Sequence, residues 1–314
     1  MNPLRPVILA AADSPRLKRM ITGTPITADI VRRFVAGEDR DELIPVVREL
    51  LASRRLISVD FLGENTTDRA QADATVAEYL SLINDLAALG GSADAAARTE
   101  VSVKLSALGQ ALPADGPAIA TENLHILCTK AGQAGVWVTV DAEDHSTTDA
   151  TLATIRQLRA EFPWLGAVLQ AYLHRTVADC GELSGAGSRI RLCKGAYREP
   201  HTVAYQRSAE VTDSYLRCLE TLMRGDGYPM VATHDPVLIR AAEQLAVETG
   251  RGPGQFEHQM LYGIRDAEQL RLAAGSTMRV YVPYGGQWYG YLTRRLAERP
   301  ANLTFFLRAL VSKS

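Results

Sequence analysis

Residues 136–172 read VWVTVDAEDHSTTDATLATIRQLRAEFPWLGAVLQAY and contain the unit that decides the fold. The unit begins with a short β-rich run, Val136–Val140, and passes through polar residues into a helical stretch, Thr148–Glu161. It ends in a second β-rich run, Ala167–Tyr172. Strands that alternate with helices are typical of parallel strands joined by crossover connections. The segment therefore predicts two parallel strands with a helix packed on their face.

The same alternation continues on both sides of this unit. Further β-rich runs lie at Ile57–Phe61, Val101–Leu105, Arg189–Cys193, Met230–Thr233, Phe256–Leu261 and Arg279–Pro283. Amphipathic stretches separate them, at Ala70–Leu86, Thr121–Ala131, Ala204–Met223, Pro236–Thr249 and Asp266–Ala274. Eight runs favour an α/β fold of the closed (βα)8 TIM-barrel type over an open doubly wound sheet. No G-x-G-x-x-G motif follows the first run, which also argues against a dinucleotide-binding open sheet.

The chain reads as one barrel preceded by helices. Residues 1–55 have a helical pattern, in which Asp41–Leu51 places apolar residues on one stripe. We therefore expect a helical arm over residues 1–55 that packs on a barrel formed by residues 56–314. The 314 residues are 46% hydrophobic and 22% charged, enough for a full core.

Charge and cysteine content narrow the function classes. The net charge is -2 and no basic block is present, so nucleic acid is not an expected partner. The four cysteines are scattered without metal-ligand spacing and read as reduced thiols. No run reaches transmembrane length, and the N-terminus is a poor signal peptide, so a cytoplasmic protein is expected.

Polar residues gather at the carboxyl ends of the β-rich runs, where (βα)8 barrels place their active sites. They are Glu64, Lys104, Asp141, Asp144, Gln170, Arg191, Lys194, Thr233, His234, Glu257, Gln259 and Tyr281. Charged groups inside apolar strands are costly unless they are paired or bound to a ligand. The pattern predicts a ligand-binding barrel mouth, although pairs such as Lys104 with Asp141 also suit a structural ion pair.

Near the C-terminus the chain reads YLTRRLAE over residues 291–298. In a helix, Tyr291, Arg294, Arg295 and Glu298 share one face. Two guanidinium groups beside an aromatic ring suit the binding of a small carboxylate, because each offers paired planar donors. A solvent-exposed helix face is the alternative.

The sequence gives less support to a metal site or to a nucleophilic lysine. Three histidines, His174, His234 and His258, fall on separate runs without a metal-binding pair, so no metal site is predicted. His234 is better read as a hydrogen-bonding group. Lys194 fits either a Schiff-base nucleophile or, with Gly195 beside it, a cradle for a phosphate group.

Taken together, the ordered motifs resemble the catalytic domain of proline dehydrogenase in its shorter, monofunctional bacterial form. The resemblance covers most of the chain, from the Phe61 run to Asn302. Its anchors are FLGE (61–64), KLSAL (104–108), VDAED (140–144), QAY (170–172), RLCKGAY (191–197), ATH (232–234), FEHQMLYG (256–263) and YLTRRL (291–296). Each is weak alone, but their order at barrel-strand spacing is specific.

The resemblance implies a distorted barrel that binds FAD, with the double-arginine segment as a final helix over the mouth. It implies oxidation of L-proline to Δ1-pyrroline-5-carboxylate by hydride transfer to the flavin N5. Electrons would pass to a quinone-type acceptor, with transient contact at the inner face of the membrane. A separate pyrroline-5-carboxylate dehydrogenase would then consume the product.

The resemblance also assigns roles to residues. Those for the substrate carboxylate are Lys104, Arg294 and Arg295, and those for the pyrrolidine ring are Leu261, Tyr281 and Tyr291. The catalytic positions are Asp141 and Arg191. Cofactor contacts are implied for Gln170, Arg191, Lys194, Gly195, Ala196, Thr233 and His234, with Ala142 where a larger residue near the flavin is expected. Glu64 and Glu298 would pair with the clamp arginines, and Glu64 with Arg294 would form a gate.

Two other functions stay open at this point. One is a barrel aldolase or lyase that uses Lys194 as a Schiff-base nucleophile. The other is a barrel that binds amino acids without catalysis. A flavin that is bleached by proline would exclude both.

Overall fold

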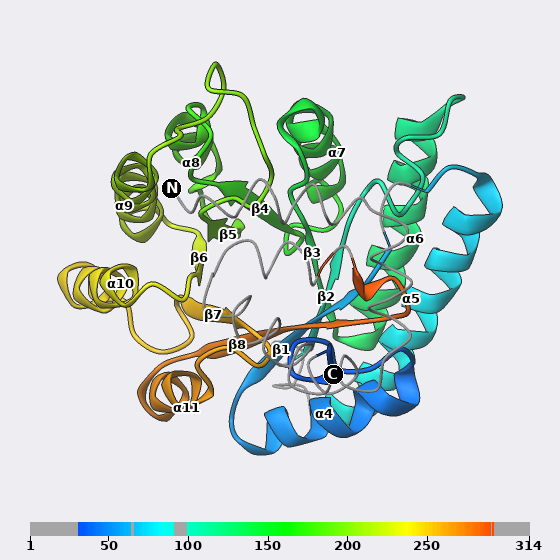
Figure 1. Ribbon diagram of the computed structural model, residues 1–314, viewed down its shortest axis with the longest axis horizontal. Coiled ribbons are helices and arrows are strands. Elements are labelled where there is room, and N and C mark those ends of the chain that lie inside the picture. The colour runs from blue at the N-terminus through cyan, green and yellow to red at the C-terminus, as the bar shows by residue number, and fades with distance from the viewer. Residues whose placement is uncertain (1–30, 64–65, 91–98, 290, 292–314) are drawn as a thin grey trace, which may run out of the picture.

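Eight parallel strands close into a barrel in chain order, and β1 pairs with both β2 and β8 (Figure 1). This computed structural model describes residues 31–63, 66–90, 99–289 and 291. The strands are β1 Leu56–Phe61, β2 Thr99–Val103, β3 Trp137–Val140, β4 Gly166–Gln170, β5 Arg189–Cys193, β6 Tyr228–Ala232, β7 Glu257–Leu261 and β8 Met278–Tyr284. Each lies on one of the predicted β-rich runs, so the (βα)8 barrel is confirmed.

Helices form the outer ring around this barrel (Figure 1). They are α4 Arg40–Ala52, α5 Arg69–Gly90, α6 Gly116–Ala134, α7 Thr148–Arg159, α8 Thr176–Leu183, α9 Ser208–Arg224, α10 Pro236–Thr249 and α11 Asp266–Gly275. The sequence pattern did not reveal α8, because its 8 residues complete only about two turns, too few to show a 3.6-residue period.

Helix α10 shows why some boundaries can be read from the sequence. Asp235 caps its start, because the Asp235 side chain accepts a hydrogen bond from the Val237 amide at 3.0 Å. Pro236 occupies the first turn, where no partner for its missing N–H is needed. Gly250 ends the helix in the left-handed conformation, with a φ of 69°. The predicted range, Pro236–Thr249, is therefore the observed one.

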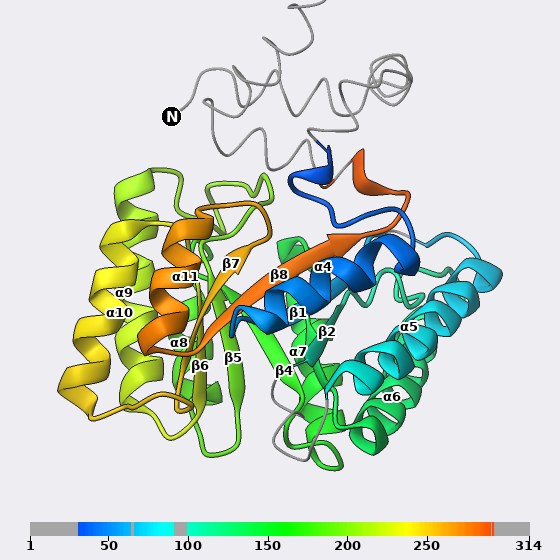
Figure 2. The ribbon, with the colours of Figure 1, turned by 90° about the horizontal axis from the view of Figure 1, so that it is seen from below.

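Helix α4 packs against β1 and β8, where the barrel closes (Figure 2). Its buried residues Leu43, Val47, Leu50 and Leu51 join the main hydrophobic core. In a regular barrel this place belongs to the helix that follows the eighth strand. The predicted helix Asp41–Leu51 is confirmed, whereas the rest of the arm (1–30) and the predicted final helix lie outside the described residues.

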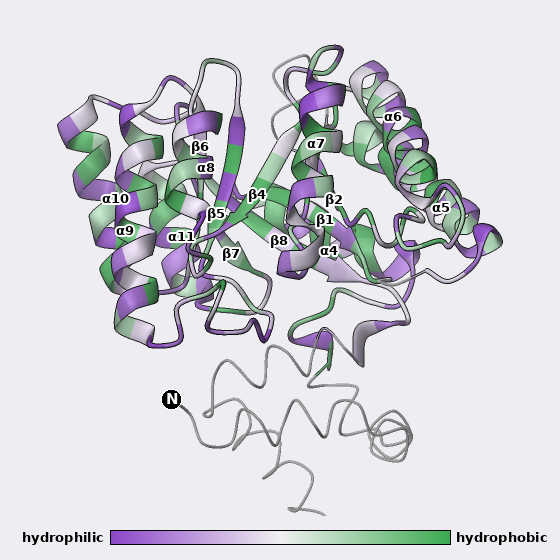
Figure 3. Cartoon of the chain, turned by 90° about the horizontal axis from the view of Figure 1, so that it is seen from above, coloured by the Kyte–Doolittle hydropathy of each residue, from purple (hydrophilic) through white to green (hydrophobic). Residues whose placement is uncertain are grey.

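Successive residues of each strand point to opposite faces, which separates the apolar packing from the polar interior. On β2, Val101 and Val103 belong to the hydrophobic core that the outer helices cover, and those helices carry mixed hydropathy (Figure 3). Glu100 and Ser102, at the alternate positions, both accept hydrogen bonds from Arg191 on β5, across the barrel. Among the described residues, no helix combines the length and the apolar character needed to cross a membrane.

Candidate active site

A cluster of charged side chains lies at the carboxyl ends of β1, β2, β3 and β8. Lys104, directly after β2, donates to both carboxylate oxygens of Asp60 at 2.9 and 2.8 Å. It also reaches Oδ2 of Asp141 at 3.3 Å, so the ion pair considered from the sequence is present. The Tyr281 hydroxyl donates to the same oxygen at 2.7 Å. We call Asp60, Lys104, Asp141, Arg191 and Tyr281 the mouth cluster.

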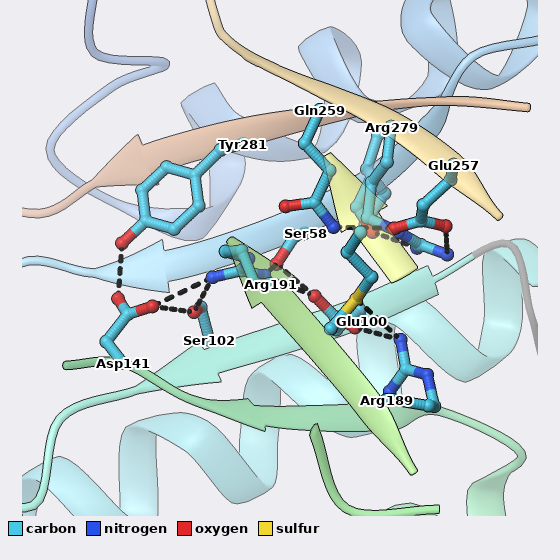
Figure 4. A network of polar contacts seen from close by, with 12 residues as sticks. Ser58, Glu100, Ser102, Asp141, Arg189, Arg191, Glu257, Gln259, Arg279 and Tyr281 are labelled. Carbon is cyan, nitrogen blue, oxygen red and sulfur yellow. Dashed lines mark hydrogen bonds and ion pairs between the residues drawn. The ribbon is translucent and has the colours of Figure 1, made fainter. Parts of the chain in front are cut away.

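Arg191 enters the mouth cluster from β5 on the other side of the barrel (Figure 4). Its Nη1 donates to Asp141 Oδ1 and to Ser102 Oγ, both at 2.8 Å. The guanidinium carbon lies 5.3 Å from the centroid of the Tyr281 ring, within cation–π range. Asp141 therefore contacts Lys104, Arg191 and Tyr281 at the same time.

The two carboxylates of the mouth cluster have different acidities. Burial raises the pKa of Asp60 to about 6, although the charge of Lys104 opposes the rise. Burial acts in the same direction on Asp141, but the charges of Lys104 and Arg191 outweigh it and hold the pKa of Asp141 below its ordinary value. Asp60 is thus poised to change its charge near neutral pH, while Asp141 stays ionised.

Charge balance limits what the mouth cluster can bind alone. Lys104 and Arg191 carry two positive charges, and ionised Asp60 and Asp141 carry two negative ones. An incoming carboxylate meets a neutral cluster unless Asp60 is protonated or further cations approach. Four charged groups are held in place here and balance one another, so a net attraction for an anion needs another group.

A second charged layer lies below the mouth cluster, nearer the amino ends of the strands. Arg279 donates to both oxygens of Glu257 at 2.7 and 3.0 Å, and all of these groups are fully buried. Arg189 donates to Glu100 at 2.5 Å and stacks on Trp137, with 3.7 Å between its guanidinium carbon and the ring centroid. We call Glu100, Arg189, Glu257 and Arg279 the floor cluster. The sequence placed Glu257 at the mouth; the structure corrects this, because Glu257 begins β7 and so lies at the opposite end.

Residues proposed as cofactor contacts lie after β4, β5 and β6. Gln170 donates to the Glu143 carbonyl at 2.8 Å, and Lys194 forms a 2.8 Å ion pair with Asp235. His234 accepts a hydrogen bond at Nε2 from the Leu261 amide at 3.0 Å. A neutral His234 ring therefore carries its proton on Nδ1. The adjacent Thr233 hydroxyl accepts from the Asp235 amide at 3.1 Å.

Gly195 follows β5 with a φ of 105°, a conformation that side chains rarely tolerate. A Cβ built there would lie 2.3 Å from the Tyr172 ring, so only glycine fits. Lys194, Gly195 and Ala196 are half-buried, and Lys194 is held by Asp235 at the start of α10. The segment thus places a glycine with positive φ directly after an ion-paired lysine at the carboxyl end of β5.

The remaining site residues are only partly placed by the structure. Leu261 ends β7 half-buried, Ala142 is half-buried beside Asp141, and Tyr291 is buried. The proposed clamp and gate residues lie outside the described residues; they are Glu64, Arg294, Arg295 and Glu298.

One acid of each cluster, Asp60 at the mouth and Glu100 at the floor, was not singled out from the sequence. Asp60 lies in the run Ile57–Phe61, and Glu100 directly precedes the run Val101–Leu105. The signal for Asp60 was available, because a charged residue inside an apolar run is the pattern that singled out Arg191. For Glu100 no such signal existed, since it stands at the edge of its run.

Two alternative chemistries can be weighed against the geometry. In the part of the chain that the structure describes, no three histidine, cysteine or acidic side chains are grouped to hold a metal ion. Lys194 has an exposed fraction of 33% for its side chain and pairs with Asp235. A Schiff-base nucleophile has to be neutral, whereas this lysine is ion-paired with a carboxylate.

A sequence model of the proline dehydrogenase family matches residues 44–308. The chain is 35% identical to a proline dehydrogenase from Deinococcus radiodurans over 310 residues, covering 98% of this chain and 97% of the relative. It is 38% identical to proline dehydrogenase 1 of Bacillus subtilis over 284 residues, covering 90% and 91% of the two chains.

Solved structures of larger proteins share the fold. Proline utilization A of Bdellovibrio bacteriovorus, inactivated by N-propargylglycine, superposes with a TM-score of 0.79 at 24% identity, covering 98% of this chain but 37% of that one. Another proline utilization A structure, with proline bound in remote sites, gives a TM-score of 0.71 at 26% identity, covering 88% of this chain and 31% of that one. The family match and the full-length relatives identify this chain as an enzyme of the proline dehydrogenase family.

Proposed function

We propose that the enzyme oxidises L-proline to Δ1-pyrroline-5-carboxylate with FAD bound over the mouth cluster. The observation that carries the proposal is the mouth cluster itself, in which Arg191 is held between the carboxylates of Asp141 and Glu100 inside the barrel.

The donor set suits a flavin nucleotide. Nε of Arg191 is buried and lacks a hydrogen-bond partner among the described residues, which leaves one donor for a ligand. Gln170, Thr233 and His234 line the same end of the barrel and would contact the ring and its linker. Lys194 with Gly195 and Ala196 would hold the phosphates. FAD, when bound, supplies the acceptor for the hydride that leaves C5 of proline.

Charge balance assigns the carboxylate clamp. The mouth cluster is neutral while Asp60 is ionised, so Lys104 by itself adds little net attraction for proline. Arg294 and Arg295 would supply the missing positive charge, each through a charge-assisted bond worth about 1.5–3 kcal/mol where water is excluded. Lys104 would then orient the carboxylate, with its own position fixed by Asp60 and Asp141.

The rest of the site would hold the substrate ring and the charges around it. Tyr281 is fixed by its hydroxyl bond to Asp141, and with Leu261 and Tyr291 it would wall the pyrrolidine ring. Holding C5 in one orientation lowers the barrier to hydride transfer, because the translational and rotational entropy of the reactants is already lost on binding. The positive charge of Arg191 would stabilise the negative charge that develops on the cofactor side. Glu64 with Arg294, and Glu298 beside it, would close the site.

We also propose that electrons pass to a quinone-type acceptor, from a cytoplasmic enzyme that touches the inner face of the membrane transiently. A separate pyrroline-5-carboxylate dehydrogenase would consume the product. These parts of the proposal rest on the family alone.

The visible spectrum of the purified protein, before and after anaerobic L-proline, tests the central claim. We expect a flavin band that bleaches with proline. A flavin band that stays unchanged would exclude proline as the substrate. Absence of flavin after reconstitution with FAD would overturn the cofactor assignment.

The clamp is tested by Arg294→Met. We expect the KM for proline to rise about 10- to 100-fold, because one charge-assisted bond is lost, while FAD content stays normal. Arg240→Met, which removes an arginine on the outer helix α10, is the matched control and should leave KM unchanged. An unchanged KM in Arg294→Met would remove that residue from the carboxylate site.

A further inference from the structure

Glu100 of the floor cluster connects directly to the mouth cluster. It is fully buried on β2, two residues before Ser102. Its Oε1 accepts from Arg191 Nη2 at 2.6 Å and from the Ser58 hydroxyl at 2.7 Å. Its Oε2 accepts from Arg189 Nη2 at 2.5 Å. Glu100 is therefore the acid through which the two layers meet (Figure 4).

Arg191 is held between two carboxylates. Its Nη1 binds Asp141 at 2.8 Å, and its Nη2 binds Glu100 at 2.6 Å and Ser58 at 3.0 Å. Because the guanidinium is planar, fixing both terminal nitrogens also fixes its plane and the direction of Nε–H. That Nε–H is the donor without a partner among the described residues.

Without the bond to Glu100, Arg191 would keep Asp141 as its one carboxylate partner in the mouth cluster. A guanidinium free to turn would form a two-bond pair with Asp141, the geometry that arginine and carboxylate favour. Such a pair would compete with Lys104 and Tyr281 for Asp141 Oδ2. The contact with Glu100 prevents this rearrangement.

We propose that Glu100 is a positioning residue for the oxidation. By holding Nη2 of Arg191, it keeps the Arg191 charge and Nε–H available to the cofactor and leaves Asp141 Oδ2 to Lys104 and Tyr281. The inference rests on the proposed function, because it needs a cofactor for Arg191 to serve.

Glu100 is equipped to stay charged in this role. Burial alone would raise its pKa, but the charges of Arg189, Arg279 and Arg191 outweigh burial and hold the pKa of Glu100 well below its ordinary value. The carboxylate therefore remains an ionised acceptor near neutral pH.

The first experiment compares Glu100→Gln with Glu257→Gln in the flavin-loaded enzyme. Both acids are fully buried and bind an arginine, but Glu257 contacts Arg279, Tyr228 and Gln259 rather than Arg191. We expect kcat to fall about 10- to 100-fold in Glu100→Gln, because a small displacement of a catalytic group is costly. KM for proline should change less than about threefold. The flavin midpoint potential should rise, because a negative charge is lost near the ring, and Glu257→Gln should show smaller changes in both quantities.

A second pair of variants separates the effect of the position of Arg191 from the effect of a lost charge. It still tests the proposal if Glu100→Gln fails to fold. Ser58→Ala removes the hydroxyl that joins Arg191 to Glu100 without changing any charge, and we expect about a threefold to tenfold loss of kcat at constant KM. Thr139→Val is its control, because the buried Thr139 hydroxyl has no partner among the described residues. It should keep the wild-type kcat.

The outcomes distinguish the two proposals. If the wild type binds flavin and is bleached by proline, but Glu100→Gln and Ser58→Ala match their controls in kcat, the positioning role is wrong and the function stands. Equal losses of kcat in Glu100→Gln and Glu257→Gln, with an unchanged kcat in Ser58→Ala, would also overturn the positioning role. Such a result would show only the effect of removing a buried charge. A wild type that cannot bind flavin overturns the proposed function, and the inference with it.

Discussion

The mouth cluster and the floor cluster have the same kinds of residue but use them differently. In the floor cluster, Arg279 binds both oxygens of Glu257, and Arg189 binds Glu100. In the mouth cluster, Lys104 is shared by Asp60 and Asp141. In the floor cluster each acid thus has an arginine of its own, and Glu100 has Arg191 as well, whereas at the mouth Asp60 shares its cation, Lys104, with Asp141. The comparison indicates that buried acids with arginines of their own stabilise the barrel. An acid that shares its cation with another acid remains able to change its charge.

The pKa values of one acid from each cluster are shifted in opposite directions, in line with this difference. Burial raises the pKa of Asp60 to about 6, whereas three arginines hold that of Glu100 well below its ordinary value. The two acids therefore affect stability in opposite ways as the pH changes. Stability from Asp60 is present below the unfolded pKa of Asp and is lost as the pH rises to about 6. Stability from Glu100 is present above the unfolded pKa of Glu and is lost as the pH falls.

The largest effect is expected from breaking a floor pair. Arg279→Met leaves the buried charge of Glu257 without its main partner and should lower the free energy of unfolding by about 3–5 kcal/mol. Urea denaturation of the purified variant measures it. Arg271→Met is the control, because Arg271 pairs with Glu243 and Glu268 at the surface and should cost less than about 1 kcal/mol. Equal stabilities for the two variants would contradict the structural role of the floor.

Substitution of an acid in the mouth cluster should have an effect of intermediate size on stability, and in the opposite direction. Asp60→Asn removes the acid whose stabilising effect is lost between about pH 4 and pH 6. Relative to the wild type, the variant should gain stability as the pH rises through this window, by about 2–3 kcal/mol in all. Thermal unfolding at several pH values measures the difference between the two proteins. A constant difference across the window would show that Asp60 titrates normally.

The smallest effect tests the hydroxyl that links Tyr281 to Asp141. Tyr281→Phe removes a 2.7 Å hydrogen bond, and kcat/KM should fall about tenfold, equivalent to about 1.4 kcal/mol. Tyr215→Phe removes a buried hydroxyl that donates to the Leu192 carbonyl on the outer side of the barrel. That control should lose stability but keep kcat/KM. Identical activities in both variants would place Tyr281 outside the reaction.

Much of the site could be predicted from the sequence because the signals were local. Arg191 interrupts an apolar strand, Lys104 and Asp141 directly follow two others, and the period of two residues in a strand tells which neighbours share its inner face. The helical start at Asp235-Pro236 and the end at Gly250 are likewise properties of adjacent residues. Such features need no knowledge of the rest of the chain.

What the sequence determined by itself is the order of strands and helices, and hence the barrel and the strand ends that form its mouth. The tertiary structure alone decided the partners. Arg191 and Glu100 are 91 residues apart in the chain and Lys104 and Asp60 are 44 apart, and they meet because the register of the closed barrel brings their strands to common levels. Whether a buried acid in the barrel has an arginine of its own or shares its cation with another acid depends on which arginines reach it from other strands. Its pKa, and so its chemistry, is a property of the assembled barrel.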